Sequence, residues 1–499
     1  MSTMTPTIAQ PYGKAMTRME IWQAPARGEA TALMSSWRSG KTRATRKFLT
    51  RIRSVWRLLL ALLPLNLAAG IALADHTRAS DEVVFTKPEC GTYAYAAPVP
   101  SIDGSSLVKE TRGTFFCTNR DFPLTYDTLS GEVGKRIKAI LSNAGTDHIS
   151  KIIIADYIFS DLNTARYICA QFAVRPFDLT IYTQQAEATS SSVGISSQVE
   201  TVLRTCAGKR LIIQRVGCDV FGKAACSSSN INTFHLKLMQ VVRMSGLVDQ
   251  IESSGNIGKG MYANLEDWVF FSRTQDRDLH SCVWPTLVAL MEAGNKPQIV
   301  YSQCVQRTVH SSNDPKLLLL PFDAEKYYQE FHKAALIATR IDVVSMDFRD
   351  RRLRGALAAA LRQGSTVNFI ASSEWHYASV ANEKQGTAEV HDIADAASLE
   401  REFPSQVRIL FAETNFYSSL RNTLHHKFVT FRTQSGNVVL TGTTNMKSGA
   451  IRRNLDQAYI FSGAVADAYV GYVDWLMPQL AVTGEMPTTR PDVVLSSRK

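Results

Sequence analysis

The chain has 499 residues, 45% hydrophobic and 20% charged, a composition that excludes a largely disordered chain and a length that suits two domains. Its formal charge of +10 belongs to the N-terminal segment, because residues 1–74 hold 11 Lys and Arg against 2 Glu, and the remainder holds 44 basic and 43 acidic residues. Charge therefore gives little support for a nucleic-acid-binding surface after residue 74.

Residues 1–74 have the pattern of an export signal. Basic residues from Arg46 to Arg57 precede the apolar run Leu58–Ala74, which is the order found in signal peptides. The polar lead of more than 50 residues is longer than usual, so either translation starts later, for example at Met34, or the run is an uncleaved anchor. Proline, asparagine and glycine within the run disfavour an anchor. We expect a secreted or periplasmic protein, with an anchored protein facing the exported side as the alternative.

All of the cysteines follow the expected cleavage point: Cys90, Cys117, Cys169, Cys206, Cys218, Cys226, Cys282 and Cys304. An even number in an exported chain indicates disulfide bonds. Cys218 and Cys226 are predicted to pair locally, because the segment around them is rich in turn-forming residues. Cys169 lies in an apolar helical pattern and is expected to be a buried free thiol. No close Cys-x-x-Cys spacing supports a zinc site.

The order of the predicted elements is that of an α/β protein with an internal duplication. Residues 75–128 are turn-rich and are expected to form an irregular cap. The first copy is predicted as helix 133–141, strand 151–159, helix 163–174, strand 177–182, helix 198–206 and strand 210–216. The second copy is predicted as helix 324–338, strand 341–348, helix 350–362, strand 366–371, helix 394–403 and strand 407–411. The predicted domains are residues 129–310 and 311–485, followed by a tail at 486–499.

The stretch Leu424–Phe431 is a candidate phosphate site. Alternation along a strand places His425 and Lys427 on one face and His426 on the other. A hairpin signal at 434–437 predicts a returning strand, which would bring Thr443 and Asn445 close to that pair. An imidazole, an ammonium and an amide side by side suit an anionic phosphate.

A second copy of this pattern lies 190 residues earlier, at His235 and Lys237, with Ser254 and Asn256 after them. His235 to Asn256 is 21 positions, and His425 to Asn445 is 20. Each asparagine is followed by an acidic residue, which is Glu266 in the first copy and Asp456 in the second. Packing of the two copies about a pseudo-twofold axis would place both His-x-Lys pairs at the seam between them.

These motifs resemble the phospholipase D superfamily, whose signature is His-x-Lys followed by a Gly-Ser-x-Asn-like element, twice in a monomeric enzyme. The resemblance covers most of residues 130–485. The family's usual aspartate after the lysine is Val242 in one copy and Arg432 in the other, and the Gly-Ser pair is replaced by Ser253-Ser254 and Gly442-Thr443. Tyrosyl-DNA phosphodiesterases also lack that aspartate, so these departures are compatible with activity.

The resemblance implies an α/β fold of two duplicated phospholipase D-like α/β/α lobes, with the active site at their seam. It also implies a covalent phosphohistidine, with His235 as nucleophile and His425 as general acid. The lysines and asparagines (Lys237, Lys427, Asn256, Asn445) would hold the phosphoryl oxygens, with Ser254 and Thr443 in support. Asp456 is expected to orient His235, and Glu266 to orient His425. No metal or other cofactor is implied.

Other candidates have plainer interpretations. Glu374-Trp375-His376 follows a predicted strand and is a possible substrate contact, whereas His391-Asp392 is expected to start a surface helix. The run Arg349–Arg354 is expected to be a solvated first helical turn, with phosphate contact as the alternative. Trp268 and the pair Phe270-Phe271 are expected in the core.

Three functions compete. The first is an exported phosphodiesterase that hydrolyses or transfers phospholipids, touching the membrane surface transiently. The second is a metal-independent secreted nuclease, and the third is a catalytically silent phosphate-binding protein. The silent protein is least favoured, because both histidines and both lysines are present. The neutral chain after residue 74 favours the lipid.

Overall fold

The structure is a computed structural model. It describes residues 81–86, 99–100, 107–108, 129, 131–143, 146–184, 194–216, 233–258, 261, 264–284, 297–308, 315–372, 393–412 and 424–482. Arg78–Lys499 forms one compact unit, and Met1–Thr77 is divided from it. The expected export signal, the tail and the pair Cys218 and Cys226 lie outside the described residues. Among the helices of the described part, none combines the length and apolar character needed to cross a membrane.

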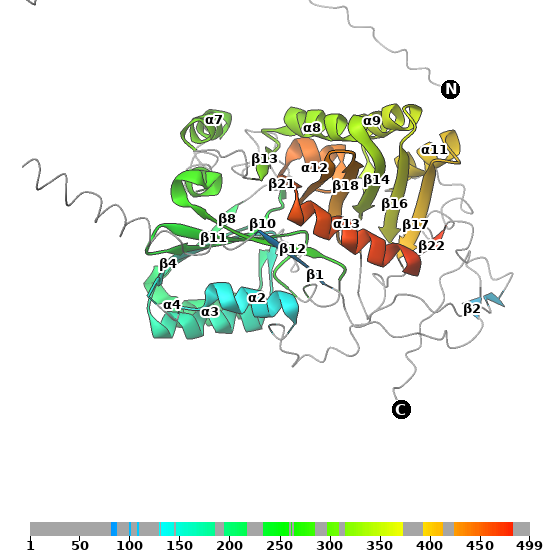
Figure 1. The fold of residues 1–499 in the computed structure, drawn as a ribbon. Helices are drawn as coiled ribbons and strands as arrows, with labels where there is room; N and C mark the ends of the chain where they lie inside the picture. The colour runs from blue at the N-terminus through cyan, green and yellow to red at the C-terminus, as the bar shows by residue number, and fades with distance from the viewer. Residues whose placement is uncertain are drawn as a thin grey trace, which may run out of the picture. The chain divides into compact units, whose positions relative to one another are not determined.

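Two sheets follow the same strand order (Figure 1). The first runs β1 (Glu82–Phe85), β12 (Asp267–Thr274), β11 (Leu247–Ser253), β10 (Lys237–Arg243), β4 (Ile149–Asp156), β6 (Asp178–Gln184) and β8 (Leu211–Val216). The second runs β13 (Lys316–Leu320), β21 (Asn454–Ser462), β19 (Gly436–Gly442), β18 (Lys427–Thr433), β14 (Ala338–Ser345), β16 (Thr366–Ser372), β17 (Val407–Ala412) and β22 (Ala481–Val482). In each sheet the central strand, β4 or β14, is antiparallel to the strand after the motif histidine and parallel to its other neighbour.

Amphipathic helices cover each sheet and build its core. We call the first sheet with α2 (Glu132–Leu141), α3 (Leu162–Val174) and α4 (Ser197–Ala207) the first lobe. We call the second sheet with α8 (Ala324–Ile337), α9 (Arg351–Arg362), α11 (Ala394–Glu402), α12 (Ser448–Arg453) and α13 (Ala464–Leu476) the second lobe. The helix α13 packs on the opposite face from α8 and α9, together with residues of both sheets. The predicted helices are confirmed with ends that differ by a few residues at most.

Two predicted strands are interrupted where the chain leaves the sheet. The strand predicted at 151–159 ends at Asp156, and β5 (Ile158–Phe159) then pairs with β7 (Gly194–Ile195) instead. The Asp156 carboxylate accepts a hydrogen bond from the Ile158 backbone N–H at 3.0 Å, which stabilises this turn. In the second lobe β15 (Phe348–Arg349) leaves in the same way and pairs with β20 (Met446–Lys447).

The edge strand β1 lies in the segment that was expected to be irregular. Its residues pair antiparallel with β12, with Glu82 opposite Phe270 and Phe85 opposite Asp267. The alternation is hard to recognise in the sequence, because this strand is short and each of its residues is half-buried.

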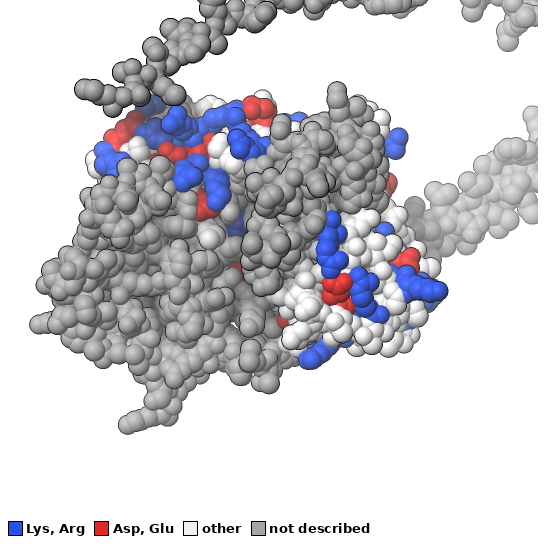
Figure 2. Space-filling model, turned by 180° about the vertical axis from the view of Figure 1, so that it is seen from behind, with Lys and Arg blue, Asp and Glu red and all other residues white. Residues whose placement is uncertain are grey.

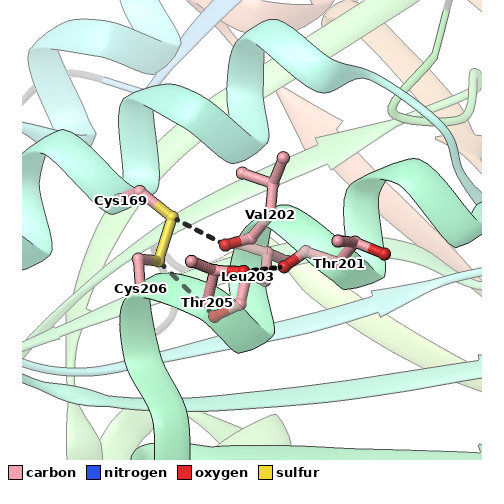
Figure 3. The surroundings of a disulfide bond; sticks show 6 residues. All are labelled: Cys169, Thr201, Val202, Leu203, Thr205 and Cys206. Atoms are coloured by element: carbon pink, nitrogen blue, oxygen red, sulfur yellow. Dashed lines mark hydrogen bonds between the residues drawn. A yellow bond between two sulfur atoms is a disulfide. The ribbon is translucent and has the colours of Figure 1, made fainter.

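The prediction of a free thiol at Cys169 is wrong. Cys169 on α3 is bonded to Cys206 on α4, with 5.6 Å between their Cα atoms (Figure 3). The two helices lie side by side, so an apolar position on one faces an apolar position on the other, and both positions carry cysteine. Cys282 is likewise bonded to Cys304, which lies on α7 (Pro297–Arg307). The prediction that the chain contains disulfide bonds is therefore correct, and only the state of Cys169 was predicted wrongly.

Candidate active site

Each motif histidine is held by the backbone of the other lobe. His235 follows β9 (Thr233–Phe234), which pairs in parallel with β21 of the second lobe, and its N–H donates to Leu455 O at 2.9 Å. Reciprocally, the His425 N–H donates to Leu265 O at 2.9 Å, next to the bridge between Leu265 and Leu424. His425 was expected within a strand, but β18 begins at Lys427 because the preceding residues turn to this inter-lobe pairing.

The first half-site is built around His235. Its Nδ1 lies 2.8 Å from Asp456 Oδ1, and its Nε2 lies 3.2 Å from Lys237 Nζ. The Thr443 hydroxyl donates to the same carboxylate oxygen of Asp456 at 2.6 Å. Since an ammonium can only donate, Nε2 is the acceptor and Nδ1 carries the proton that Asp456 receives. His235 therefore presents its Nε2 lone pair on the side of Lys237.

The second half-site is built around His425, whose Nδ1 lies 3.2 Å from Glu266 Oε1. Asn264 Nδ2 donates to that oxygen at 2.9 Å. Lys427 Nζ donates to His425 O at 2.8 Å and to Ser254 O of the first lobe at 3.1 Å. The contacts predicted between each histidine and the carboxylate of the opposite copy are present in both pairs, and the orienting role of the carboxylates stays a prediction.

The two asparagines stand apart from this hydrogen-bonded set. The side-chain carbonyl oxygens of Asn256 and Asn445 are buried and accept no hydrogen bond within the described part of the chain. Ser254, two residues before Asn256, accepts from the Asp267 N–H through its hydroxyl at 3.0 Å. Thr443, predicted beside His425 and Lys427, instead bonds Asp456 of the first half-site, and the catalytic roles of these residues stay predictions.

Burial of so many charged groups sets their protonation. Lys237 and Lys427 are only 2% and 1% exposed. Burial lowers the pKa of Lys237 to about 8, against the pull of Asp456, and lowers that of Lys427 to about 7 with the help of Lys237. Burial likewise raises the pKa of Glu266 to about 7. Near neutral pH, Lys237, Lys427 and Glu266 therefore all gain or lose protons within a narrow pH range.

Both imidazoles are held neutral in the free chain. Burial, then Lys237, lowers the pKa of His235, although Asp456 opposes this. Burial, then Lys427 and Lys237, holds the pKa of His425 well below its usual value. Burial alone would raise the pKa of Asp456, but His235, Lys237 and Thr443 keep it below the usual value. The contact of Lys427 Nζ with Ser254 O of the first lobe joins the two half-sites.

Sequence reasoning missed Asp156 and Tyr157. Asp156 is fully buried opposite Lys237 in the β4–β10 pair, and its Oδ2 accepts from the Ile257 N–H at 2.8 Å, one residue after Asn256. Burial raises its pKa to about 7, against the effect of Lys237. The ring of Tyr157 lies 5.2 Å from that of His235. A carboxylate that ends an Ile-Ile-Ile-Ala run was the signal, since ligand sites gather at the carboxyl ends of parallel strands.

His426 has a structural place. As predicted, it lies on the face opposite His425, and it is fully buried. Its Nδ1 lies 2.7 Å from Asp267 Oδ1 and its Nε2 lies 2.8 Å from the Tyr472 hydroxyl. Arg432, which stands where the family has aspartate, instead pairs with Asp474 on α13 at 2.6 Å.

The remaining residues singled out in the sequence lie in the core, at a helix start or outside the described residues. Trp268 and Phe270 are in the first-lobe core as predicted, and Phe271 is buried in the core between the sheets. The run from Arg349 leads into α9, with Asp350 as its N-cap. Glu374-Trp375-His376 and His391-Asp392 lie outside the described residues.

Comparisons with known proteins agree with the motifs. Residues 327–475 match the family model described as "Cardiolipin synthase, PLD-like domain". A comparison with curated proteins found no match. The match lies within the second lobe and agrees with the predicted resemblance of this part of the chain to the phospholipase D superfamily.

Several solved structures of low identity are similar to parts of this chain. Phosphatidylserine synthase of Haemophilus influenzae Rd KW20 is 11% identical over 70% of this chain and 84% of that chain, with a TM-score of 0.47. The yeast tyrosyl-DNA phosphodiesterase is 12% identical over 65% and 84%, with a TM-score of 0.37. Polyphosphate kinase from Porphyromonas gingivalis is 10% identical over 71% of this chain, with a TM-score of 0.44, and this chain spans 45% of that enzyme.

Proposed function

We propose that this chain, whose residues 327–475 form a phospholipase D-like domain, is an exported phosphodiesterase that cleaves phospholipids through a covalent phosphohistidine. One observation carries the proposal. Each imidazole donates its Nδ1–H to a carboxylate from the other lobe, His235 to Asp456 and His425 to Glu266. In each ring Nε2 is then the nitrogen that the carboxylate does not engage, and we assign it the nucleophilic and acid–base work; Nε2 of His235 accepts from buried Lys237.

In the first step the Nε2 lone pair of His235 attacks phosphorus. A P–N bond forms as the bond from phosphorus to the leaving alcohol breaks, and the alcohol oxygen takes its proton from Nε2 of His425. His425 must be protonated for this step, although its pKa is low in the free chain. The negative charge of a bound phosphodiester raises that pKa, so substrate binding prepares the acid.

In the second step water attacks phosphorus and the P–N bond breaks. Neutral His425 takes the proton from water, and His235 regains its lone pair as a phosphate monoester leaves. An alcohol in place of water would give transfer instead of hydrolysis. Lys237 and Lys427 supply fixed positive charge for the oxygens throughout, and Asp456 stabilises the positive charge that develops on the His235 ring.

The surroundings of the site favour a phospholipid as substrate. The matching family model is named for cardiolipin synthase, which supports a lipid phosphodiester. After residue 74 the basic and acidic residues nearly balance, whereas nucleic-acid surfaces generally carry an excess of positive charge. The disulfides Cys169–Cys206 and Cys282–Cys304 support export to an oxidising compartment.

The test compares lipid with nucleic acid on the same preparations. The chain, His235→Ala and His425→Ala are incubated in chelator with phosphatidylcholine or phosphatidylglycerol vesicles, and separately with plasmid and single-stranded DNA. We expect release of the head group by the unaltered chain and loss of several orders of magnitude in both variants, because neither histidine can replace the other.

Labelling identifies the nucleophile. With a good leaving group that needs no acid, His425→Ala should still form a labelled phosphohistidine, whereas His235→Ala should not. Labelling that survives only in His235→Ala would reverse the two roles. DNA cleavage that vanishes in both variants, with lipid untouched, would make the protein a nuclease.

A further inference from the structure

A cluster of basic side chains lies next to the second half-site. It comes from β15, β20, α9 and α12, and we call it the basic rim: Arg349, Arg351, Arg352, Lys447, Arg452 and Arg453. Lys447 follows Asn445 by two residues, and its N–H donates to Asn445 O at 2.8 Å. Arg349 of β15 lies opposite Lys447 of β20 in the backbone pairing of these two parallel strands. In Figure 2 Lys and Arg side chains, with Asp and Glu among them, lie along the upper edge of the face, the region of α8 and α9.

Part of this charge has no carboxylate partner. Arg352 pairs with Glu325, and Lys447 with buried Asp347 at 2.9 Å. Within the described part of the chain, Arg351, Arg452 and Arg453 form no ion pair, and all three are exposed.

The cations of the basic rim are held close together. The guanidinium groups of Arg352 and Arg452 both lie over the ring of Tyr328, at 3.9 and 5.5 Å from its centroid. The Tyr328 hydroxyl donates to Asp350 at 2.7 Å, so that acid is already engaged. Glu325 neutralises Arg352, whereas Arg452 has no ion pair within the described residues, so an added anion would reduce its repulsion from the neighbouring cations. The basic rim is therefore suited to an anionic partner.

The fold itself does not demand these arginines. In the first lobe α3 starts in the same way as α9, with Asp161 as N-cap, but its first residues are Leu162, Asn163 and Thr164. Cations in the first turn of a helix oppose its dipole, so arginines there lower the stability of the helix. A feature that the other copy lacks, and that costs stability, calls for a functional explanation.

The side of the site that carries His235 is apolar instead. There β5 stands at the position that β15 has in the second lobe, and it pairs with β7; Ile158 and Ile195 are half-buried, as is Tyr157 beside His235. The surroundings of the two histidines are thus asymmetric, basic beyond Asn445 and apolar beyond His235. A phospholipid with an anionic head group has the same asymmetry, because negative charge on one side of the phosphodiester adjoins a glycerol and its acyl chains on the other.

We propose that the basic rim docks the enzyme on an anionic phospholipid bilayer, so that a lipid enters with its head group toward Lys447 and its glycerol toward Ile158. The proposal rests on the proposed phospholipase function and names the surface that the enzyme works on. Arginine suits this role, since its planar guanidinium makes two hydrogen bonds to one phosphate. The rim supplies long-range attraction, and the apolar side receives the lipid backbone.

The test removes the three arginines that lack ion pairs. The triple variant Arg351→Ala/Arg452→Ala/Arg453→Ala is compared with a control that loses the same charge from exposed first-lobe positions, Arg166→Ala/Arg175→Ala/Lys209→Ala. Binding to phosphatidylcholine vesicles, with and without phosphatidylglycerol, is measured by flotation at low and high salt. The full chain is used, and also the compact unit that begins at Arg78, which removes the basic N-terminal segment.

We expect the rim variant to bind phosphatidylglycerol vesicles about 100-fold more weakly at low salt, because each basic residue near an anionic membrane contributes about fivefold. The control should bind like the unaltered chain, and vesicles without phosphatidylglycerol should not distinguish the three proteins. Hydrolysis of the soluble diester bis(p-nitrophenyl) phosphate should be unchanged in both variants, which shows that the site is intact.

Equal binding of the rim variant and the control to anionic vesicles would overturn the proposal. So would a rim variant that keeps vesicle binding and loses binding to single-stranded DNA, since the rim would then serve a nucleic acid. Vesicle binding needs no turnover, so the result holds even if neither protein hydrolyses a phosphodiester. In that case the proposed function fails and the docking surface is still decided.

Discussion

At the scale of single residues, the two carboxylates are not equivalent. Asp456 is held ionised by His235, Lys237 and Thr443, and it lies 2.8 Å from its imidazole. Glu266 has a pKa raised to about 7 by burial, and it lies 3.2 Å from His425. The nucleophile needs a fixed tautomer with a permanent counter-charge, whereas the acid must gain and lose a proton. The assignment of His235 as nucleophile agrees with this difference.

Replacing each carboxylate by its amide tests this asymmetry. Asp456→Asn should lower kcat about 100-fold, because an amide no longer fixes the Nδ1–H tautomer of His235 or stabilises its positive charge. Glu266→Gln should cost less and should chiefly shift the pH profile of kcat, since the partner of the acid is lost. Steady-state kinetics across pH give both numbers. A larger loss of kcat in Glu266→Gln would contradict the assignment.

The shifted lysines predict that oxyanion binding takes up protons. Their pKa values of about 8 for Lys237 and about 7 for Lys427 mean that both lose their protons as pH rises through this range. A bound anion favours the charged lysines, so protons enter with it and affinity falls with rising pH. Ionisation of Glu266 adds negative charge over the same range and acts in the same direction. Tungstate affinity should fall about tenfold per pH unit for each proton taken up.

Calorimetry of tungstate binding in two buffers of different ionisation enthalpy counts those protons. Lys427→Met should bind tungstate more weakly and take up fewer protons than the unaltered chain, because one titrating cation is gone. Affinity that stays constant from about pH 6 to about pH 9 would contradict the linkage.

At the scale of elements, the sequence predicted what is periodic and repeated. Helix and strand runs recur at a fixed offset, so a unit recognised once is recognised twice, and the observed sheets have the same strand order. The His-x-Lys pairs were found because the two residues of each pair are only two positions apart, so the sequence alone shows them together. Where an element ends depends on distant partners: β4 stops at Asp156 because its carboxylate bonds Ile158 and Ile257.

Pairings between the lobes were the harder part. The contacts of Asp456 and Glu266 were placed only through the family resemblance, because partners 221 and 159 positions away leave no local pattern. The same holds for Asp267 with His426, which no argument from spacing suggested. The prediction of a free thiol at Cys169 was wrong for a similar reason, since its disulfide partner is on the next helix. Local sequence shows that a cysteine is apolar, and only packing shows what it faces.

One turn between strands can be tested directly. Gly442 ends β19 with φ of 149°, and a Cβ there would collide with the β21 backbone at Gln457 O and Ala458 Cα. Gly442→Ala should destabilise the protein by about 2 kcal/mol and lower kcat, because the strain moves Thr443 away from Asp456. Gly449→Ala in α12 is the control, since its Cβ would meet nothing within 4 Å. Denaturant unfolding that cannot distinguish the two variants would refute this account.

At the scale of the whole molecule, neither lobe alone contains all the residues of the candidate active site. His235 comes from the first lobe and its carboxylate from the second, and the reverse holds for His425. Loosening either lobe must therefore disturb both histidines. Disulfide bonds are distributed unevenly along the chain. Every cysteine precedes residue 305, so the chain has no cysteine after α7. Cys169–Cys206 joins helices of the first lobe, whereas Cys304 packs with Leu319 and Leu455 of the second sheet, so redox conditions should act on the shared site through both lobes.

Removal of the disulfides tests that coupling. Cys169 and Cys206 close a loop of 37 positions, so replacing both by serine should lower the free energy of unfolding by about 4 kcal/mol. Hydrogen exchange should then quicken first in α3 and α4, which the bond joins, while α8 and α9 keep their protection. Activity should fall with the loosening of the first lobe, because that lobe carries His235, the proposed nucleophile. Thiol titration of the unaltered native chain is the control, and reactive thiols at Cys169 or Cys206 would contradict both the bond and the oxidising compartment inferred from it.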